Sequence, residues 1–386
     1  MSSPEKKKKL LLNPLQFLPQ STPNRRSLVS LTPSSMSSPE TKRKKPSFLS
    51  QSTPNLSLPD DLLLSCFARV SKLYHPYLFL VSKSLRSLLA SPDLYKTRAL
   101  LNRTESCLYV CLRFLPDPNP NPRWFTLSRR PNRTLTTKKK KPSDHLLVPF
   151  TSPHYTPLRS SYVAVGSDIY EIGGLINGVP SARVSILNCR SNTWHKAPNM
   201  EVAREHPHAI AIDEKILVKG GLRLQDSNLP KWIEVFDPKT QTWMIVPFLS
   251  DSKDWKSPDG AGMAWQSASS CVIDDVSYNY CEGLFKWFDE KVREWRILKG
   301  MEGLPKYLFG RNNTSSHVQL VDYGGKMAVL WDRHDSSSKS QGRVIWCAEI
   351  SLERCNSEEI SGTVEWSEAV LKASSFAFVH VLAATL

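Results

Sequence analysis

Histidines and cysteines are the side chains of this 386-residue chain whose spacing would most readily reveal metal or nucleophile chemistry. His206 and His208 flank Pro207 as an HxH pair, but no third ligand stands at a recognisable spacing. The cysteines include no CxxC pair and none at zinc-finger distance from a histidine; they are residues 66, 107, 111, 189, 271, 281, 347 and 355. We therefore expect no metal, no cofactor, and reduced thiols of the intracellular kind.

Two glycine pairs could suggest a phosphate-binding loop. They end "DIYEIGG" at Gly173 and Gly174, and "EKILVKGG" at Gly220 and Gly221. Neither pair has a GxGxxG context, and neither is followed by GK[ST]. The second glycines of the pairs are 47 residues apart, which is about the length of one four-stranded propeller blade. We expect the glycines to be architectural and to let a strand turn near a crowded propeller axis.

Three tryptophans stand in similar sequence contexts, and two of them follow the glycine pairs in the chain. Trp194 ends "LNCRSNTW", Trp243 ends "FDPKTQTW" and Trp295 ends "FDEKVREW". Each has a large apolar residue seven positions earlier and an Asn or Asp six positions earlier: Leu187 and Asn188, Phe236 and Asp237, Phe288 and Asp289. An Asx side chain bonds its own backbone two residues on and closes a turn. Each repeat is therefore predicted to end in a hairpin, with the apolar residue and the tryptophan supplying core area.

The arrangement resembles the kelch repeat, a four-stranded propeller blade. The resemblance extends to the residues between blades, because Pro198, Met200 and Arg204 occupy positions where kelch repeats carry these residue types. A third unit has "VSYNYCEG" instead of the diglycine, and a fourth runs from "HVQLVDYGGKMAVLWD" to Trp366. Residues 107 to 127 look like a decayed first blade, which the final strand "SSFAFVHVLAAT" would complete and close. We expect five or six blades.

A short helical region precedes the repeats. Pro59, Asp60 and Asp61 are suited to a first helical turn, and Leu63, Phe67 and Val70 follow at helical spacing. A second apolar stretch, "YLFLVSKSLRSLL", follows a link containing Pro76, and Pro92 opens a third stretch ending near Leu101. About 45 residues of short helices make a small core, so this module is expected to need a partner.

The helical region resembles the F-box, with "LP" at Leu58 and Pro59 and with "LVSKSLRSLLASPDLY" in its second half. An unrelated helical hairpin is the alternative. The resemblance implies docking on a Skp-like adaptor of a cullin ubiquitin ligase. The adaptor-binding candidates it implies are Leu58, Pro59, Leu62, Leu63, Val81 and Leu85. F-boxes often carry an aromatic residue at the position of Leu85, so that contact is expected to be weaker.

An F-box followed by kelch repeats resembles the F-box/kelch-repeat family of plants, over residues 56 to 386. The resemblance implies an all-α F-box module at 56–101 and an all-β kelch-type propeller at 106–386, with a basic loop at 128–145. It also implies a non-catalytic receptor in which the F-box binds the adaptor and the propeller binds an unknown substrate protein for ubiquitination. A kelch scaffold without ligase assembly and a kelch-fold enzyme are the alternatives. For an oxidase we find no spaced Tyr, His and Cys cluster.

Residues 1–55 are predicted to be a disordered basic tail. They are rich in Ser, Pro and Lys and partly duplicated, since "MSSPEKKKKL" at 1 returns as "MSSPETKRKK" at Met36. Met36 could therefore be the working start. "KRKK" at 42–45 fits either a nuclear localisation signal or a merely solvated tail.

The formal charge of +15 is concentrated in two segments. The first 56 residues carry +8, residues 128 to 141 carry +7, and the rest of the chain sums to zero. Nucleic-acid binding is therefore disfavoured. With no apolar stretch long enough to span a membrane, we expect a location in the cytoplasm, the nucleus or both.

Overall fold

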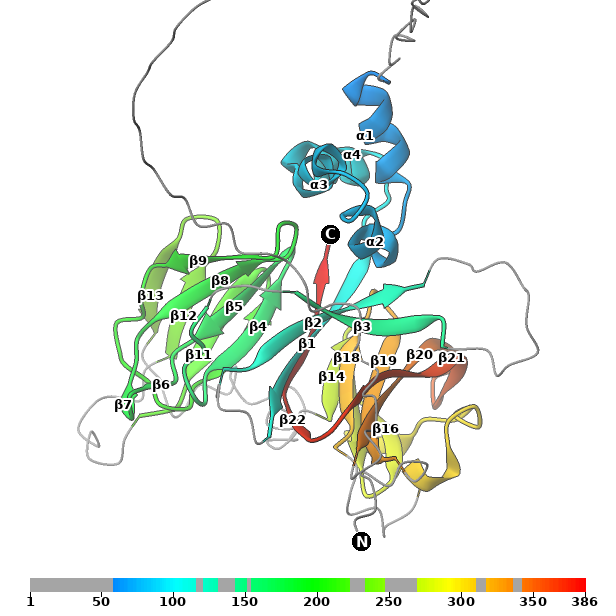
Figure 1. Ribbon diagram of the computed structural model, residues 1–386. Helices are drawn as coiled ribbons and strands as arrows, with labels where there is room; N and C mark the ends of the chain where they lie inside the picture. The colour runs from blue at the N-terminus through cyan, green and yellow to red at the C-terminus, as the bar shows by residue number, and fades with distance from the viewer. Residues whose placement is uncertain are drawn as a thin grey trace, which may run out of the picture. The chain divides into compact units, whose positions relative to one another are not determined.

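The computed structural model describes a helical segment followed by β-sheets. The residues described are 58–115, 121–130, 143–150, 154–222, 233–246, 269–309, 317–335 and 342–386. The helices come first in the chain: α1 Asp60–Ala68, η1 Lys72–Tyr74, α2 His75–Leu78, α3 Lys83–Ala90 and α4 Pro92–Leu100. Five four-stranded antiparallel sheets follow and form the blades of a five-bladed β-propeller (Figure 1).

The first blade joins the two ends of the sheet region. It has the order β22-β1-β2-β3, with bounds Phe376–Thr385, Ser106–Phe114, Arg123–Arg129 and His145–Phe150. β1 and β22 pair from Ser106 opposite Thr385 to Phe114 opposite Phe376. The prediction that the final strand completes the first blade is therefore confirmed. Without β22, the edge of β1 that faces the centre of the ring would be left unpaired.

The other four blades each use consecutive segments of the chain. Blade 2 contains β4 Ser161–Val165, β5 Asp168–Ile172, β8 Val184–Asn188 and β9 Thr193–Ala197, with a ribbon of β6 Leu175–Ile176 and β7 Val179–Pro180 between β5 and β8. Blade 3 contains β10 His208–Ile212, β11 Lys215–Lys219, β12 Ile233–Asp237 and β13 Thr242–Val246.

Blade 4 contains β14 Ser270–Ile273, β15 Val276–Cys281, β16 Leu284–Asp289 and β17 Glu294–Ile297. Blade 5 contains β18 Gln319–Asp322, β19 Met327–His334, β20 Arg343–Asn356 and β21 Glu359–Ala373, and is preceded by η5 Lys306–Leu308. Strands at the start of each sheet order contact one another around the ring: β4 contacts β22 and β10, and β18 contacts β22 and β14. The innermost strands of the five blades are therefore β22, β4, β10, β14 and β18.

The predicted hairpin turns are present in blades 2, 3 and 4. The side-chain oxygen of Asn188 accepts from the Arg190 N–H at 3.1 Å, and that of Asp237 from the Lys239 N–H at 2.8 Å. Asp289 makes the same bond in blade 4. The apolar residue before each turn is buried, but Trp194, Trp243 and Trp295 are only half-buried, because they lie on the outermost strand.

The diglycines end the second strands of blades 2 and 3. Gly174 has φ +93°, and a Cβ there would lie 2.7 Å from the Leu158 carbonyl oxygen. A Cβ at Gly221 would lie 2.7 Å from the carbonyl carbon of His206. The crowding at these two glycines arises from the connections between blades, and their architectural role stays a prediction. The pair Gly324 and Gly325 differs, because it forms the β18–β19 turn.

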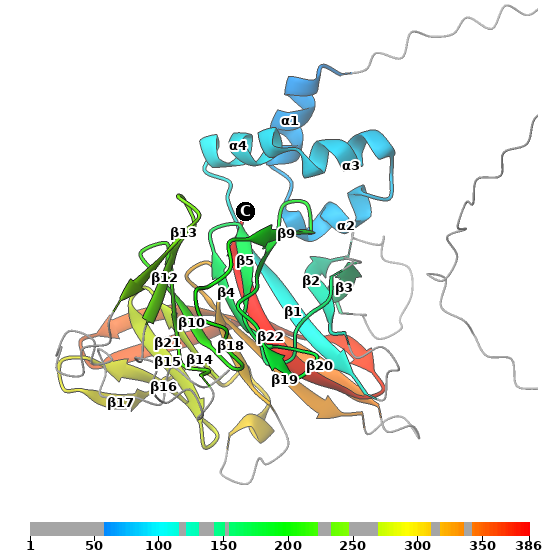
Figure 2. The ribbon, with the colours of Figure 1, turned by 90° about the vertical axis from the view of Figure 1, so that its left-hand side faces the viewer.

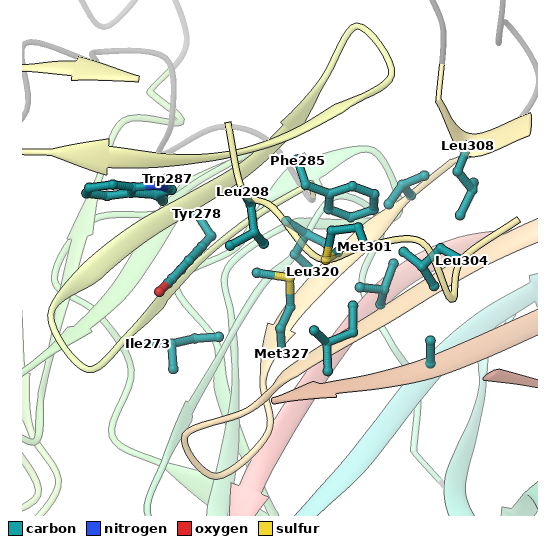
Figure 3. Packing of buried hydrophobic residues seen from close by; sticks show 14 of the residues in the cluster. Ile273, Tyr278, Phe285, Trp287, Leu298, Met301, Leu304, Leu308, Leu320 and Met327 are labelled. Carbon is teal, nitrogen blue, oxygen red and sulfur yellow. The ribbon is translucent and has the colours of Figure 1, made fainter. Parts of the chain in front are cut away.

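Hydrophobic cores lie between neighbouring blades. The largest joins blades 4 and 5, where Trp287 and Tyr278 of one blade and Leu320 and Met327 of the next lie in one apolar cluster (Figure 3). Met301, in the connection between these blades, belongs to the same cluster. The stability of each blade therefore depends on its neighbours.

The helical segment differs in detail from the sequence prediction. α1 begins after Pro59 as expected, but it ends at Ala68, so Val70 lies outside it. The residues of α1 in the core are Leu64, Phe67 and Ala68 rather than Leu63. The second apolar stretch is divided into α2 and α3, because the Ser82 side chain accepts from the Leu85 N–H at 3.1 Å and caps a new helix. Pro76 lies inside the first turn of α2.

Candidate protein-binding surfaces

Five large apolar side chains are exposed on the helical segment: Leu100, 85% exposed at the end of α4, and four that lie near the starts of α1 and α3. Leu58 is 58% exposed, Leu62 53%, Leu80 75% and Val81 68%. Burying a leucine or valine contributes about 1.5–3 kcal/mol, so leaving these four exposed on a module this small indicates a partner surface. These exposed side chains do not belong to the core of the protein, so their apolar surface is available to a partner.

The predicted adaptor-binding residues lie in, or just before, two helices, α1 and α3. Pro59 is exposed at the start of α1, whereas Leu63 and Leu85 are half-buried. α1 packs chiefly against α4, and α3 contacts α2 and α4. The predicted residues therefore form a group on α1 and a group at the start of α3. Their binding role stays a prediction. The exposure of Leu80 was missed, although it lies in the same apolar run as Val81.

A buried polar junction attaches the helical segment to blade 2. The Lys72 ammonium donates to the Tyr95 hydroxyl at 2.8 Å and to the Cys189 carbonyl at 2.9 Å. The Tyr95 hydroxyl lies 3.1 Å from the Arg190 carbonyl oxygen. Burial lowers the pKa of Lys72 to about 8. No motif marks these residues in the sequence, because their partners lie more than 90 positions apart.

Arg204, predicted between blades, is fully buried. Its guanidinium donates to the Glu234 carboxylate at 2.9 and 3.0 Å and to the Gly220 carbonyl at 2.7 Å. Glu234 is buried as well and also accepts from the Glu201 N–H at 2.7 Å. This pair ties the connection after blade 2 to β12 and to the second diglycine, so its role is structural.

A second buried carboxylate, Glu171, is surrounded by donors. The Tyr162 hydroxyl and the His154 imidazole Nε2 each lie 2.6 Å from it, and Arg183 lies at 3.1 Å. The His154 ring also stacks on Trp194 with centroids 3.9 Å apart. The groups that face this carboxylate belong to blade 2 and to the connection that precedes it. We interpret this cluster as a structural link between the first two blades.

Two cysteines of β1 are buried and unsuited to nucleophilic chemistry. Burial raises the pKa of the Cys107 thiol to about 12 and raises that of Cys111 well above its usual value. Such thiols stay protonated and are weak nucleophiles. Within the described ranges no group of three or more His, Cys, Asp or Glu could hold a metal ion. The His206 and His208 rings are neighbours, with centroids 5.7 Å apart.

Four polar segments of the sequence lie wholly or largely outside the described residues, and the structure therefore does not show whether any of them takes part in binding. These are the propeller loops "RLQDSNLPK" and "SDSKDWKSPDG", the basic run "KRKK", and most of the basic loop at 128–145. In the part of the chain that is described, no helix is long and apolar enough to cross a membrane. A polar cavity of about 400 Å³ borders Glu105, Lys326 and Glu349, but Lys326 is engaged by Glu349 at 2.6 Å.

Comparison with known domain families gives two matches. The F-box domain profile matches residues 55–97. The profile described as FKB95, Kelch-repeats domain, matches residues 124–257 and 248–371. The first match covers the helices up to the middle of α4, and the second covers most of the propeller.

The chain is also similar to whole proteins of Arabidopsis thaliana. It is 46% identical to the F-box/kelch-repeat protein At4g39550 over 400 residues, covering 91% of this chain and all of that protein. It is 48% identical to the F-box/kelch-repeat protein At5g49000 over 391 residues, again covering 91% of this chain and all of the relative. The similarity therefore extends through both the helical segment and the propeller.

Proposed function

Because the chain belongs to the F-box/kelch-repeat protein family, we propose that it is the substrate-recognition subunit of an SCF-type (Skp–cullin–F-box) ubiquitin ligase. The F-box implies binding of a Skp-like adaptor, and through the adaptor a cullin. The propeller would hold the target protein. The observation that carries this proposal is the presence, in one chain, of an F-box with exposed apolar residues and a complete five-bladed propeller.

The proposed mechanism is proximity. Holding a target next to a ubiquitin-loaded enzyme raises the effective concentration of the two reactants, so the receptor itself supplies no nucleophile. The geometry of that encounter depends on how firmly the F-box is attached to the propeller. The bonds from Lys72 to the Cys189 carbonyl and from Tyr95 to the Arg190 carbonyl support a fixed attachment.

We propose that the main adaptor-binding residues are Leu58, Pro59, Leu62 and Val81. Leu63 and Leu85 are half-buried and would contribute less to binding. The first four are exposed and would lose the most water-accessible apolar surface on binding. Interface energy concentrates in a few anchors, and truncating one costs on the order of 2 kcal/mol or more. That cost corresponds to roughly a thirtyfold weaker complex for each anchor.

A double variant, Leu58→Ala with Pro59→Ala, tests the proposal. We expect it to abolish recovery of the Skp-like adaptor and cullin in co-purification, while the melting of the propeller stays unchanged. Leu100→Ala is the matched control, because Leu100 is 85% exposed at the end of α4 and outside the predicted set. Undiminished adaptor recovery in the double variant would remove the ligase assignment and favour a kelch scaffold.

A further inference from the structure

The outermost strand of blade 3, β13, has one edge to which the fold adds no strand. β13 pairs with β12 from Thr242 opposite Asp237 to Val246 opposite Ile233. Among the described residues no strand pairs with its other edge, since β13 ends the sheet order of its blade. β13 lies on the left-hand side of the propeller in Figure 1, and this side faces the viewer in Figure 2. The backbone groups of such an edge can pair with another extended chain.

The outer strands of the other four blades carry features that protect an exposed edge, namely charged side chains, proline or an irregular register. β3 of blade 1 contains Pro149, and the His145 N–H at its start donates to the Glu368 carboxylate at 2.9 Å. β9 of blade 2 contains the exposed Lys196, and β17 of blade 4 contains the exposed Glu294. β21 of blade 5 contains glutamates and pairs irregularly with β20.

β13 itself has none of these protections. Its sequence is TWMIV, without a charged residue or a proline, and its pairing with β12 is regular. Met244 is 57% exposed and Ile245 38%, so apolar side chains are open on both faces of the strand. Trp243 is held in place, because its ring centre lies 4.9 Å from that of Phe236 and its indole N–H donates to the Pro198 carbonyl at 2.9 Å. The position of the strand is therefore fixed, while apolar side chains beside its edge are exposed.

A row of apolar side chains crosses blade 3 and ends at this edge. Ile210 of β10 lies opposite Leu217 of β11. Leu217 lies opposite Val235 of β12, which in turn lies opposite Met244 of β13. Leu217 and Val235 are buried and belong to one apolar cluster. Cross-strand neighbours on one face are the pairs that stabilise a sheet. A fifth strand beside β13 would continue this row and would cover Met244 with another apolar side chain.

The size of the edge favours a peptide segment over a second copy of the chain. β13 has five residues, which span about 17 Å. Stable complexes of two folded proteins bury about 1,200–2,000 Å² of surface, and one added strand of this length covers only a fraction of that area. An extended segment, by contrast, can bind a sheet edge through its backbone hydrogen bonds, while its alternate side chains give specificity.

We propose that β13 binds an extended, uncharged segment of the target protein as a fifth strand of blade 3. The backbone of the segment would hydrogen-bond to the edge of β13, and one of its apolar side chains would lie beside Met244. A charged side chain at that position would be unfavourable, because it would enter an apolar row. That the segment belongs to a target rests on the proposed receptor function, but the addition of a strand does not.

The test measures binding of the full chain to a fluorescein-labelled peptide of alternating valine and threonine, flanked by glutamines, by fluorescence anisotropy. Met244→Lys places a charge beside the edge and should weaken binding roughly tenfold. Met244→Glu should weaken it as much, because the sign of the charge does not matter. The matched control is Ile297→Lys, since Ile297 is 58% exposed on β17, an outer strand that already carries charge. This control should bind the peptide like the unaltered chain.

A second peptide separates strand addition from a simple apolar contact. It is N-methylated at each residue, so it keeps the side chains and loses the backbone donors. It should not bind, because a strand pairs through its N–H groups. Ile245→Lys changes the other face of β13 and should weaken binding as Met244→Lys does, so the test does not depend on the folding of one variant. Equal binding of the two peptides would overturn the proposal, as would equal losses in the Met244 and Ile297 variants.

Oligomeric state and adaptor recovery are measured on the same variants. Light scattering should show a monomer. A dimer that Met244→Lys dissociates, with no binding of the peptide, would overturn the proposal in favour of a second copy. Lost peptide binding with normal adaptor recovery in Met244→Lys supports β13 as a target site separate from the F-box. Peptide binding without adaptor recovery in the unaltered chain would support strand addition at β13 while removing the ligase assignment.

Discussion

Arg98 and Glu105 form an ion pair, with the Arg98 NH2 nitrogen 2.7 Å from the Glu105 Oε1 oxygen, at the point where the F-box passes into the propeller. The Arg98 side chain is only 2% exposed, and it also donates to the Val70 carbonyl at 2.8 Å. Glu105 accepts in addition from the Ser71 hydroxyl at 2.8 Å and from the Lys72 N–H. One carboxylate therefore joins η1, α4 and the start of β1.

Glu105→Ala should lower the free energy of unfolding by about 3–5 kcal/mol, because it leaves the buried Arg98 charge without its partner. Chemical denaturation measures this loss. Lys96→Ala is the control on the same helix, since the Lys96–Asp93 pair is exposed at both ends and such pairs contribute about 0–1 kcal/mol. If both variants unfold alike, the junction is not held by the Arg98–Glu105 pair.

His75 should make the F-box sensitive to acid. It is 1% exposed, and burial together with the charges of Lys72 and Arg98 lowers its pKa from 6.5 to about 3. Between pH 6.5 and about 3 the unfolded chain binds a proton that the folded chain does not. The stability that His75 contributes above pH 6.5 is therefore lost progressively as the pH falls through this window.

His75→Phe should remove this part of the acid sensitivity. Unfolding of the variant and the unaltered chain, followed at several pH values between 7 and 4, should show a difference that grows toward low pH. The exposed His195, changed to Phe, serves as the control. Parallel pH profiles for the His75 variant and the unaltered chain would contradict the prediction.

Gly174→Ala should be more damaging than Gly178→Ala. Both glycines have positive φ, so both changes carry a strain of about 1–2 kcal/mol. At Gly174 the added methyl would also lie 2.7 Å from the Leu158 carbonyl oxygen, whereas nothing lies within 4 Å at Gly178. Thermal unfolding of the two variants measures the difference, and equal melting temperatures would show that the connection between blades can move aside.

Removing residues 376–386 should cause aggregation. The deletion takes away β22, which pairs with β1 along its whole length, and uncovers apolar residues beneath it. Light scattering after size-exclusion chromatography detects the aggregates. A variant that begins at Met36 is the control at the other terminus, and we expect it to melt like the full chain. A monomeric truncated protein with unchanged unfolding would disprove closure by β22.

The sequence alone determined the repeating elements of this protein. The Asx residue before each hairpin turn, the glycines after the second strands and the helix-opening prolines act on the backbone within a few residues. Local chemistry of this kind is visible in any single repeat. Closure of the first blade by the final strand could be predicted on a different ground, because pairing these two strands protects the edge of β1.

Only the tertiary structure decided which side chains are buried and which remain available. The contacts of Lys72 with Cys189 and of Tyr95 with Arg190 bring together residues from distant segments, and no spacing rule marks such pairs. The same holds for α1, where Leu64 rather than Leu63 enters the core, because helical spacing gives a stripe but not its direction. The packing partner, which the helix meets only in the folded chain, determines that direction.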